Sequence, residues 1–258
     1  MSKPVAIVLA AGSGTRMNSK LPKVLIEVYG RAMVEYVLDA LHAGGVERIL
    51  VVVGHRSDLV RRTLADHLDL TFVEQTEQLG TGHAVMACRE ALADHDGAVL
   101  IVTGDSPLVQ ADSVRALLND FQRESPACIV GTTHKEDPTG LGRIVRDAPG
   151  NFIEIVEEKD ATPEQREILE VNMSTYVFDC HKLLESLKRL TTDNAQGEYY
   201  ITDCPGILRR RGEDVRATNA LKPCEALSVN TLEDLDRVAA EMKRLDYPSA
   251  RKAEGRGH

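Results

Sequence analysis

The 258-residue sequence has no tryptophan, few other aromatic residues (4% in all) and no excess of basic residues. Its 40 acidic and 31 basic side chains give a formal net charge of -9. That balance argues against nucleic acid or an anionic membrane surface as the main partner. The composition, 43% hydrophobic and 28% charged, is that of an ordinary globular protein. The length allows one large α/β domain or two small ones.

Cysteine pairs and long apolar runs are also lacking. The five cysteines never form a C-x-x-C pair, a pattern that fits a reducing compartment better than a disulfide framework and offers no metal-ligand spacing. No apolar segment approaches the length that spans a bilayer, and the chain enters the strand-like PVAIVLAA without a cationic leader. We therefore expect a cytoplasmic protein with neither membrane nor nucleic acid as a partner.

The first half of the chain alternates short apolar runs with amphipathic segments. The runs are rich in Val and Ile and nearly continuous, typical of parallel strands buried on both faces, and cover 4–11, 48–54, 70–75, 98–104 and 127–133. The segments between them each carry one apolar stripe and predict helices over 32–45, 57–68, 82–94 and 112–124. Ser57 and Asp112 are placed as N-caps. The alternation predicts an α/β fold with a Rossmann-like, doubly wound, mostly parallel sheet.

The pattern changes after about residue 134, where strands become amphipathic or mixed and predict an antiparallel, substrate-side lobe. These strands cover 143–147, 151–158 and 171–178. A last helix is expected over 231–245 and a disordered tail over 247–258. We interpret 1–246 as one domain, with one half over about 1–134 and a second side over about 135–230.

Unusual polar residues follow three of the predicted strands. GSGTRM (12–17) comes after the first, EQTEQLGTGH (74–83) after the third and TGDSP (103–107) after the fourth. In an open parallel sheet, ligands bind beyond the carboxyl ends of the strands. Three separate strands therefore direct glycines and polar groups to one edge of the sheet.

The first of these loops resembles a phosphate loop more than a dinucleotide fingerprint. Gly12 and Gly14 begin a G-x-G-x-x-G pattern, but its third position is Met17, and no acidic residue ends the second strand as a ribose ligand would. No Walker A sequence is present. A glycine loop with Arg16 and Lys23 beside it can surround phosphate oxygens. The residues alone also allow a tight strand-to-helix turn with two surface cations.

The other two loops complete a nucleotide site. Asp105 would be out of place beside phosphates unless a divalent cation lay between them, which favours Mg²⁺ over a carboxylate that only caps the next turn. Gln75 and Gln78 can contact the polar edge of a base, and Gly80 lets the base lie close to the backbone. A helix starting near Thr81 adds its positive end at the same edge.

Later motifs suit a sugar. Gly142 lies in the glycine turn DPTGLGR, Glu157 in the strand end VEEKD and Asn172 in EVNMS. A carboxylate, an amide and backbone N–H groups together can bind vicinal hydroxyls. VEEKD also fits a solvated strand end.

Taken in order, these motifs resemble a known family. LAAGSGTRM with LPK, EQLGTGHA, GD, DPTGLGRI, VEEKDAT, NAQGEYYITD and VNT are similar to the uridylyltransferase domain of bacterial GlmU, among the sugar-nucleotide pyrophosphorylases. The resemblance covers residues 4 to about 245, and it implies a nucleotide-binding half over about 1–134 and a sugar-phosphate side over about 135–230. It implies a nucleotidyltransferase fold of the GT-A-like type. It also implies Mg²⁺-dependent transfer of a uridylyl group from UTP to N-acetylglucosamine 1-phosphate, with release of pyrophosphate.

The resemblance also implies roles for particular residues. The nucleotide would be held by Leu9, Ala10, Ala11, Gly12 and Gly14, with Gln75, Gly80 and Thr81 at the uracil. The catalytic groups would be Arg16, Lys23 and Asp105. Mg²⁺ would be bound by Asp105 and Asn230. The sugar phosphate would be bound by Thr103, Gly142, Glu157, Asn172 and Thr202.

Three departures from the GlmU pattern bear on substrate and assembly. Thr103 stands where the pattern has tyrosine, and Met173 and Ser174 stand where it has threonine and glycine. The hexapeptide-repeat β-helix that carries acetyltransferase activity does not follow in this chain, so a monomer or dimer is expected. A glucose-1-phosphate uridylyl- or thymidylyltransferase, or a non-catalytic UDP-sugar-binding regulatory protein, are the alternatives.

Overall fold

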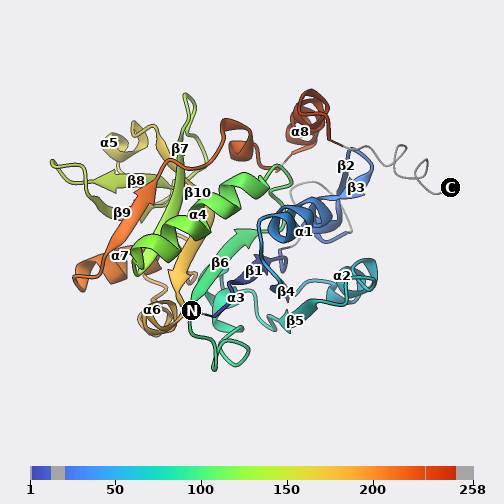
Figure 1. Cartoon of the computed structure of the whole chain (residues 1–258). Coiled ribbons are helices and arrows are strands. Elements are labelled where there is room, and N and C mark those ends of the chain that lie inside the picture. The colour runs from blue at the N-terminus through green and yellow to red at the C-terminus, as the bar shows by residue number, and fades with distance from the viewer. Residues whose placement is uncertain (1, 13–20, 230, 248–258) are drawn as a thin grey trace.

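The computed structural model describes residues 2–12, 21–229 and 231–247. Its centre is a sheet of nine strands (Figure 1). One half of the sheet has the order β6-β1-β4-β5 and is parallel throughout. Its strands are β1 (Val5–Leu9), β4 (Arg48–Val53), β5 (Leu70–Glu74) and β6 (Ala98–Thr103). Each matches a predicted apolar run. β1, β4 and β6 are flanked on both sides and covered on both faces, which leaves almost no exposed position for a polar side chain, whereas β5 lies at the edge of the sheet and is only partly buried.

The other half of the sheet contains the reversed strand β10 (Glu170–Asp179). It pairs antiparallel with β6 on one side and with β7 (Cys128–His134) on the other. β11 (Val215–Thr218) then pairs parallel with β7 at the far edge. The predicted antiparallel strands are therefore confirmed, and β10 belongs to the central sheet itself. The hairpin of β8 (Arg143–Arg146) and β9 (Phe152–Val156) branches from it.

Helices cover both faces of this sheet, as a doubly wound fold requires (Figure 1). One face packs against α1 (Met33–Ala43), α2 (Ser57–Thr63) and α4 (Ala111–Glu124). The opposite face packs against α3 (Thr81–Met86), α6 (Cys180–Leu187), α7 (Asp203–Arg210) and the β8–β9 hairpin. Single turns complete the fold at η2 (Lys23–Leu25), α5 (Pro163–Arg166) and η3 (Pro223–Ala226).

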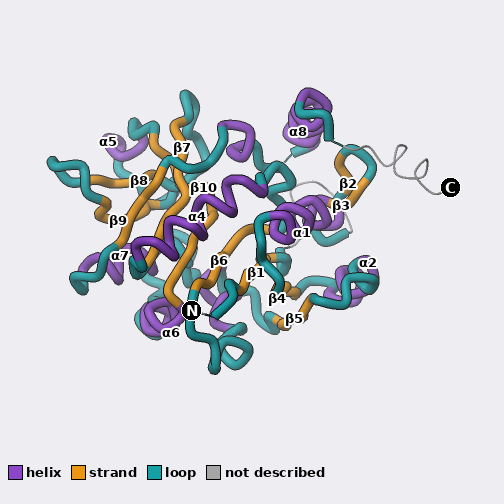
Figure 2. Tube along the Cα trace, in the orientation of Figure 1, coloured by secondary structure: helices purple, strands orange, loops and turns teal. Residues whose placement is uncertain are grey.

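A third, smaller apolar cluster holds the C-terminal helix α8 (Leu232–Arg244), which the sequence predicted. Val238 and Met242 of α8 are buried with residues of α1 and of the small hairpin β2 (Glu27–Val28) and β3 (Arg31–Ala32). Figure 2 shows α8 beside that hairpin, away from the β8–β9 side. Tyr247, the first residue of the predicted tail, packs on Tyr36 with ring centroids 5.9 Å apart.

Helix ends differ from the sequence prediction. α2 begins after Arg56, which has a positive φ of 51°, so Ser57 is the first helical residue and not the cap. Gln110 is the N-cap residue of α4, and Asp112 lies inside its first turn. The helix predicted over 82–94 continues only to Met86 before the chain passes into turns. The conformation of the backbone that enters each helix determines where the helix begins, and this conformation cannot be predicted from the residue type alone.

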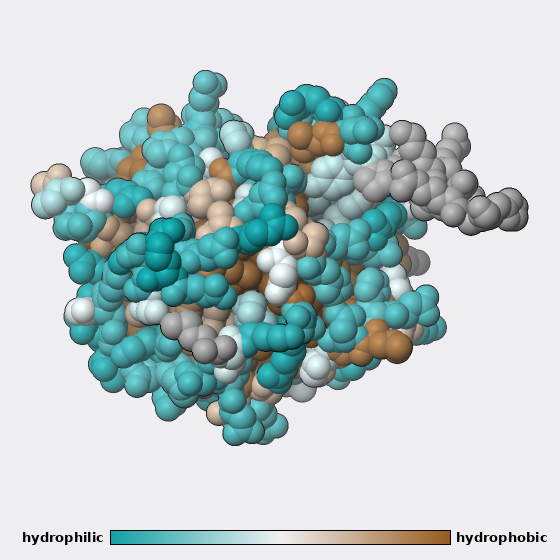
Figure 3. Space-filling view, in the orientation of Figure 1, coloured by the Kyte–Doolittle hydropathy of each residue, from teal (hydrophilic) through white to brown (hydrophobic). Residues whose placement is uncertain are grey.

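The face of the molecule in Figure 3 is mainly hydrophilic, with hydrophobic residues visible in places between the polar ones. None of the helices in the described ranges is both long enough and apolar enough to cross a bilayer. The domain limits predicted from the sequence stay predictions.

Truncation of a central strand residue should destabilise the whole sheet. Ile7 in β1 is fully buried, so Ile7→Ala should lower the free energy of unfolding by about 2–5 kcal/mol, measured by urea denaturation. Leu68→Ala is the matched control, because Leu68 is 95% exposed and its loss should change stability by less than about 0.5 kcal/mol. Equal effects of the two changes would contradict the assignment of β1 to the centre of the core.

Candidate active site

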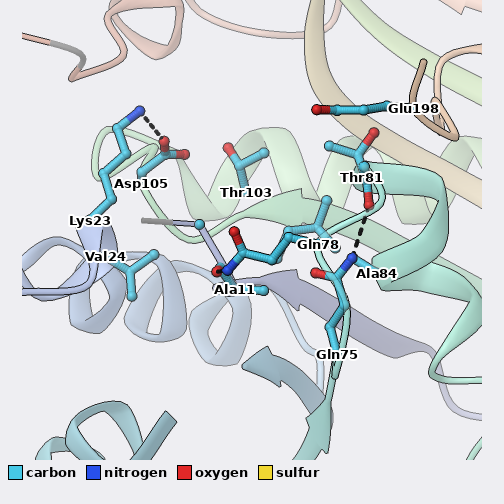
Figure 4. Close-up of a pocket in the computed structure, with 13 residues that line it drawn as sticks. Ala11, Lys23, Val24, Gln75, Gln78, Thr81, Ala84, Thr103, Asp105 and Glu198 are labelled. Atoms are coloured by element: carbon cyan, nitrogen blue, oxygen red, sulfur yellow. Dashed lines mark hydrogen bonds and ion pairs between the residues drawn. The ribbon is translucent and has the colours of Figure 1, made fainter. Parts of the chain in front are cut away.

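A cavity of about 290 Å³ lies beyond the carboxyl ends of β1, β5 and β6 (Figure 4). Its lining residues come from all three loops that the sequence marked, from the segment around Lys23, and from Glu198 in the motif NAQGEYYITD. They are Leu9, Ala11, Gly12, Lys23, Val24, Gln75, Gln78, Gly80, Thr81, Ala84, Thr103, Asp105 and Glu198. The predicted convergence of three strand ends on one site is therefore what the fold produces.

The chain leaving β1 passes very close to the ends of both neighbouring strands. The Gly104 N–H donates to the Leu9 carbonyl at 2.9 Å, and the Ala10 N–H donates to the Val52 carbonyl at the same distance. A Cβ added to Gly104 would lie 3.2 Å from the Leu9 carbonyl oxygen, and one added to Gly54 would lie 3.0 Å from the Ala11 Cβ. Glycine at both positions leaves room for this close packing.

The predicted glycine loop is thus described only at its start. Ala11 and Gly12 line the cavity, whereas Ala10 is buried and its N–H is taken by the sheet. Gly14 and Arg16 lie outside the described residues, as does Asn230.

One end of the cavity carries a paired cation and anion. Lys23 Nζ lies 2.5 Å from Asp105 Oδ2, with the two side chains 20% and 22% exposed. Lys23 is the first residue of η2, and Asp105 follows Gly104 at the end of β6. The described residues hold no cluster of three or more His, Cys, Asp or Glu that could bind a metal. Asp105 is ion-paired with Lys23 and also lines the cavity, and one such carboxylate is within the ligand set of Mg²⁺, which takes one or two protein carboxylates together with phosphate oxygens and waters.

The opposite end of the cavity is built from amides and backbone. Gln75 is 5% exposed, and its Nε2 donates to the Gly80 carbonyl at 3.1 Å and lies 3.2 Å from His83 Nδ1. Gln78 Nε2 donates to the Ala11 carbonyl at 2.9 Å, which ties the second loop to the first. The contact with His83 helps to orient the Gln75 amide.

The loop that carries Gly80 docks on a segment more than a hundred residues later. The Gly82 N–H donates to the Tyr199 carbonyl at 2.7 Å, and the Tyr199 N–H donates to the Leu79 carbonyl at 2.8 Å. Gly80 has a φ of +105°, and a Cβ there would lie 2.6 Å from the Tyr199 carbonyl oxygen. The Ile201 N–H also donates to Thr81 Oγ1, at 3.1 Å. EQLGTGHA and NAQGEYYITD are therefore two sides of one contact, and through it Glu198, which the sequence analysis did not single out, reaches the cavity.

Four predicted sugar-side residues cluster separately from this cavity. The Asn172 N–H donates to the Gly142 carbonyl at 2.8 Å, and Thr202 Oγ1 donates to Glu157 Oε1 at 3.0 Å. A Cβ on Gly142 would lie 3.5 Å from Asn172 Cβ and 3.7 Å from Glu157 Cδ. Burial raises the pKa of Glu157, an effect opposed by the Thr202 hydrogen bond. The structure thus brings Gly142, Glu157, Asn172 and Thr202 together.

Two of the three positions that depart from the GlmU pattern, Thr103 and Ser174, lie on the neighbouring strands β6 and β10. Thr103 lines the cavity and its Oγ1 lies 2.7 Å from Ser106 Oγ. β10 runs antiparallel to β6 with Tyr176 opposite Ile101, so Ser174 and Thr103 both lie two residues further toward the cavity edge. Ser174 has a φ of 50°, in the left-handed region that glycine adopts without strain. That conformation accounts for the glycine in the GlmU pattern.

Asp203 begins α7 directly after Thr202. Burial raises its pKa to about 6; Arg210 opposes this rise, while Asp160 and Glu154 add to it. The sugar-side cluster therefore adjoins a second carboxyl group whose charge is destabilised.

Comparison with known proteins identifies the family. The sequence model of the MobA-like NTP transferase domain matches residues 6–207. The chain is 48% identical over 228 residues to the bifunctional protein GlmU of Streptococcus equi subsp. zooepidemicus, which covers 88% of this chain and 49% of that protein. It is 46% identical over 244 residues to that of Brevibacillus brevis, covering 95% and 52%. The chain thus spans about half the length of these curated relatives.

A solved structure agrees on the fold. It is a Bacillus anthracis protein provisionally described as a glucose-1-phosphate thymidylyltransferase, in complex with sucrose. The TM-score is 0.78 at 20% identity, over 95% of this chain and 97% of the other.

Fold and family together define an enzyme of the nucleotidyltransferase class. The chain belongs to the MobA-like NTP transferase domain family. Its similarity to GlmU proteins confirms the resemblance seen in the motifs.

Gly80→Ala should break the contact between the two loops. The new Cβ would meet the Tyr199 carbonyl, and a φ of +105° is unfavourable for alanine, so stability should fall by about 1–3 kcal/mol and nucleotide affinity by tenfold or more. The control is Gly150→Ala, at a φ of +90° with nothing within 4 Å of the added atom. It should destabilise through backbone strain alone and leave nucleotide binding, measured by calorimetry, unchanged. Similar binding losses in both variants would contradict the docking role of Gly80.

Asp203→Asn should change how stability depends on pH. Because the folded-state pKa is raised from 3.8 to about 6, ionisation of Asp203 destabilises the wild type progressively as pH rises between those values. Asp203→Asn lacks this loss, so its stability advantage over the wild type should be absent near pH 4 and reach about 1–2 kcal/mol above pH 6.5, because solvent screening at this partly buried site reduces the effect. Urea denaturation from pH 4 to 8 measures it, with the exposed Asp66→Asn as control. A stability advantage of Asp203→Asn that shrinks as the pH rises would contradict the raised pKa of Asp203.

Proposed function

We propose that this protein transfers a uridylyl group from UTP to N-acetylglucosamine 1-phosphate or a related sugar 1-phosphate, releasing pyrophosphate. The observation that carries the proposal is that the two ends of the cavity differ in their chemistry. The Lys23–Asp105 pair lies at one end and the Gln75–Gly80–Thr81 group at the other (Figure 4). This is the arrangement that a molecule with a polar base at one end and phosphates at the other requires.

The base end would bind uracil through the Gln75 side chain and the backbone around Gly80. Gln75 is held by its bonds to Gly80 and His83, so its amide has a defined orientation before the nucleotide arrives. Such preorganisation reduces the entropic cost of binding. The nucleotide would lie along the start of the loop after β1 and contact Leu9, Ala11, Gly12 and Gly14. Ala10 is buried and would only hold the backbone of this loop in position.

The phosphate end would combine protein cations with a metal ion. Asp105 and Asn230 would hold Mg²⁺, which supplies charge neutralisation to the phosphates when bound. Lys23 now faces Asp105 and would contact phosphate oxygens, with Arg16 as a second cation. The ion pair lies within the cavity, so a phosphate chain could contact Lys23 directly and reach Asp105 through the Mg²⁺ that it would hold.

The sugar end would be the cluster of Gly142, Glu157, Asn172 and Thr202, with Thr103 between it and the phosphates. Glu157 and Asn172 supply acceptor and donor groups to vicinal hydroxyls, and their backbone neighbours fix their positions. The bulged, left-handed backbone at Ser174 shapes the edge of this side.

The reaction requires no general base. A sugar 1-phosphate is already an oxyanion at neutral pH, and its oxygen would attack the α-phosphorus of UTP in line. The new O–Pα bond forms as the Pα–O bond to the β-phosphate breaks, and the electron pair leaves with pyrophosphate. Two polyanions must be brought together against their repulsion, so positioning and electrostatic stabilisation would supply most of the rate.

A thymidylyltransferase is the second candidate, because the Bacillus anthracis protein of the same fold has that description. Gln75 would contact a part of the base that uracil and thymine share. A non-catalytic UDP-sugar-binding protein is disfavoured, since binding alone does not need Lys23 paired with Asp105 in the cavity.

The decisive assay follows pyrophosphate from Mg²⁺, UTP or dTTP and a panel of sugar 1-phosphates. Lys23→Ala and Asp105→Ala should each lower kcat/KM by two or more orders of magnitude, because each removes charge compensation at the reacting phosphates. Lys3→Ala, at an exposed ion pair with Glu47, is the matched control and should keep full activity. Circular dichroism should show all three folded. Absence of pyrophosphate release with every sugar would refute the proposed function, and near-normal turnover of a variant would refute that residue's role.

A further inference from the structure

Glu198 is a half-buried carboxylate in the cavity wall to which neither the motifs nor the family comparison gave a role. Figure 4 shows its side chain pointing across the cavity from the side of Thr81, opposite the Lys23–Asp105 pair. Within the described ranges, no hydrogen-bond donor or cation contacts its carboxylate. A negative group in a site that accepts polyanions needs a specific explanation, because it repels phosphates in its vicinity.

The backbone around Glu198 is held on both sides. Asn194 Nδ2 donates to the Glu198 carbonyl at 2.6 Å, and the Glu198 N–H donates to Asn194 Oδ1 at 3.2 Å. The next residue, Tyr199, is bonded to Leu79. A Cβ on Gly80 would lie 2.8 Å from Glu198 Cβ, so the absence of a side chain at Gly80 lets Glu198 lie directly over the base loop. The backbone on both sides of Glu198 therefore fixes where its side chain enters the cavity.

The position defines what the carboxylate can bind. Phosphates would go to Lys23 and the base to Gln75, and Glu198 lies over the base loop on the side away from Lys23. The ribose is the part of a nucleotide attached directly to the base, so it is the part that the Glu198 carboxylate can reach. A carboxylate only accepts hydrogen bonds, and its two oxygens match the two hydroxyls of a ribose. Acidic side chains bind ribose hydroxyls in dinucleotide sites of other proteins. We propose that Glu198 binds the ribose hydroxyls of the nucleotide and selects ribonucleoside over 2′-deoxyribonucleoside triphosphates.

This inference rests on the proposed function and sharpens it. A thymidylyl donor is a 2′-deoxynucleotide and has no 2′-hydroxyl to donate to Glu198. The base contacts at Gln75 do not separate uracil from thymine, so the sugar of the nucleotide supplies the discrimination. Glu198 is then a specificity-determining residue that acts in binding, before the transfer step.

The test compares UTP with 2′-deoxyuridine triphosphate, which share a base and a phosphate chain. Calorimetry with Mg²⁺ should show the wild-type protein binding UTP about tenfold or more tightly, because a hydrogen bond to a charged acceptor is lost with the deoxy ligand. Glu198→Ala should weaken UTP binding to the level of the deoxy ligand, whose own affinity should stay equal or rise. Glu198→Gln, which keeps the length and one acceptor oxygen, should retain part of the preference.

Asp193→Asn is the matched control, since it removes an exposed carboxylate from the same segment and should leave the preference intact. Thermal unfolding verifies that each variant is folded. Three results would overturn the inference: an equal loss of both ligands in Glu198→Ala, a preference unchanged in it, or an effect confined to the KM of the sugar phosphate. A wild-type enzyme that turns over UTP without preferring it to the deoxy ligand overturns the inference alone. A protein that neither binds nor turns over UTP refutes the proposed function as well.

Discussion

The site depends on how closely the backbone leaving β1 passes its two neighbouring strands. Gly54 and Gly104 end those strands, and a side chain on either would press against the chain between Leu9 and Ala11. Because this passage is narrow, Asp105 emerges directly beside the start of the first loop, and Gln78 can bond to the Ala11 carbonyl. Because the strands are parallel, their loops leave the sheet at the same edge, and because Gly54 and Gly104 have no Cβ atom, these loops can pack closely together.

Much of this arrangement could be predicted from local sequence signals. Buried parallel strands have an apolar pattern of their own, and the polar loops at their ends were recognisable without knowing which strands are neighbours. The position of β10 between β6 and β7 could not be predicted this way, because pairing between distant strands leaves no local periodicity. The N-caps expected at Ser57 and Asp112 were wrong for a related reason, since the incoming backbone set the helix ends.

Glu198 was missed because its importance comes entirely from a long-range contact. Its neighbour Tyr199 is bonded to Leu79, and a few residues further on Thr202 is bonded to Glu157. One short segment therefore touches both the proposed base pocket and the proposed sugar cluster. The backbone from 198 to 202 therefore connects the proposed base pocket directly to the proposed sugar cluster.

The reversed strand also constrains the order in which the sheet can form. β7 pairs only with β10 and β11 among the described strands, and both follow it in the chain by more than thirty residues. During synthesis, β7 emerges from the ribosome before any partner exists, and β6 keeps one open edge until residue 179 is available. The four strands of the parallel half, β1, β4, β5 and β6, can pair early. The other half of the sheet can form only after β10 has been synthesised and has inserted between β6 and β7. Such non-local closure slows folding and leaves strand edges exposed to chaperones or to other chains in the interval.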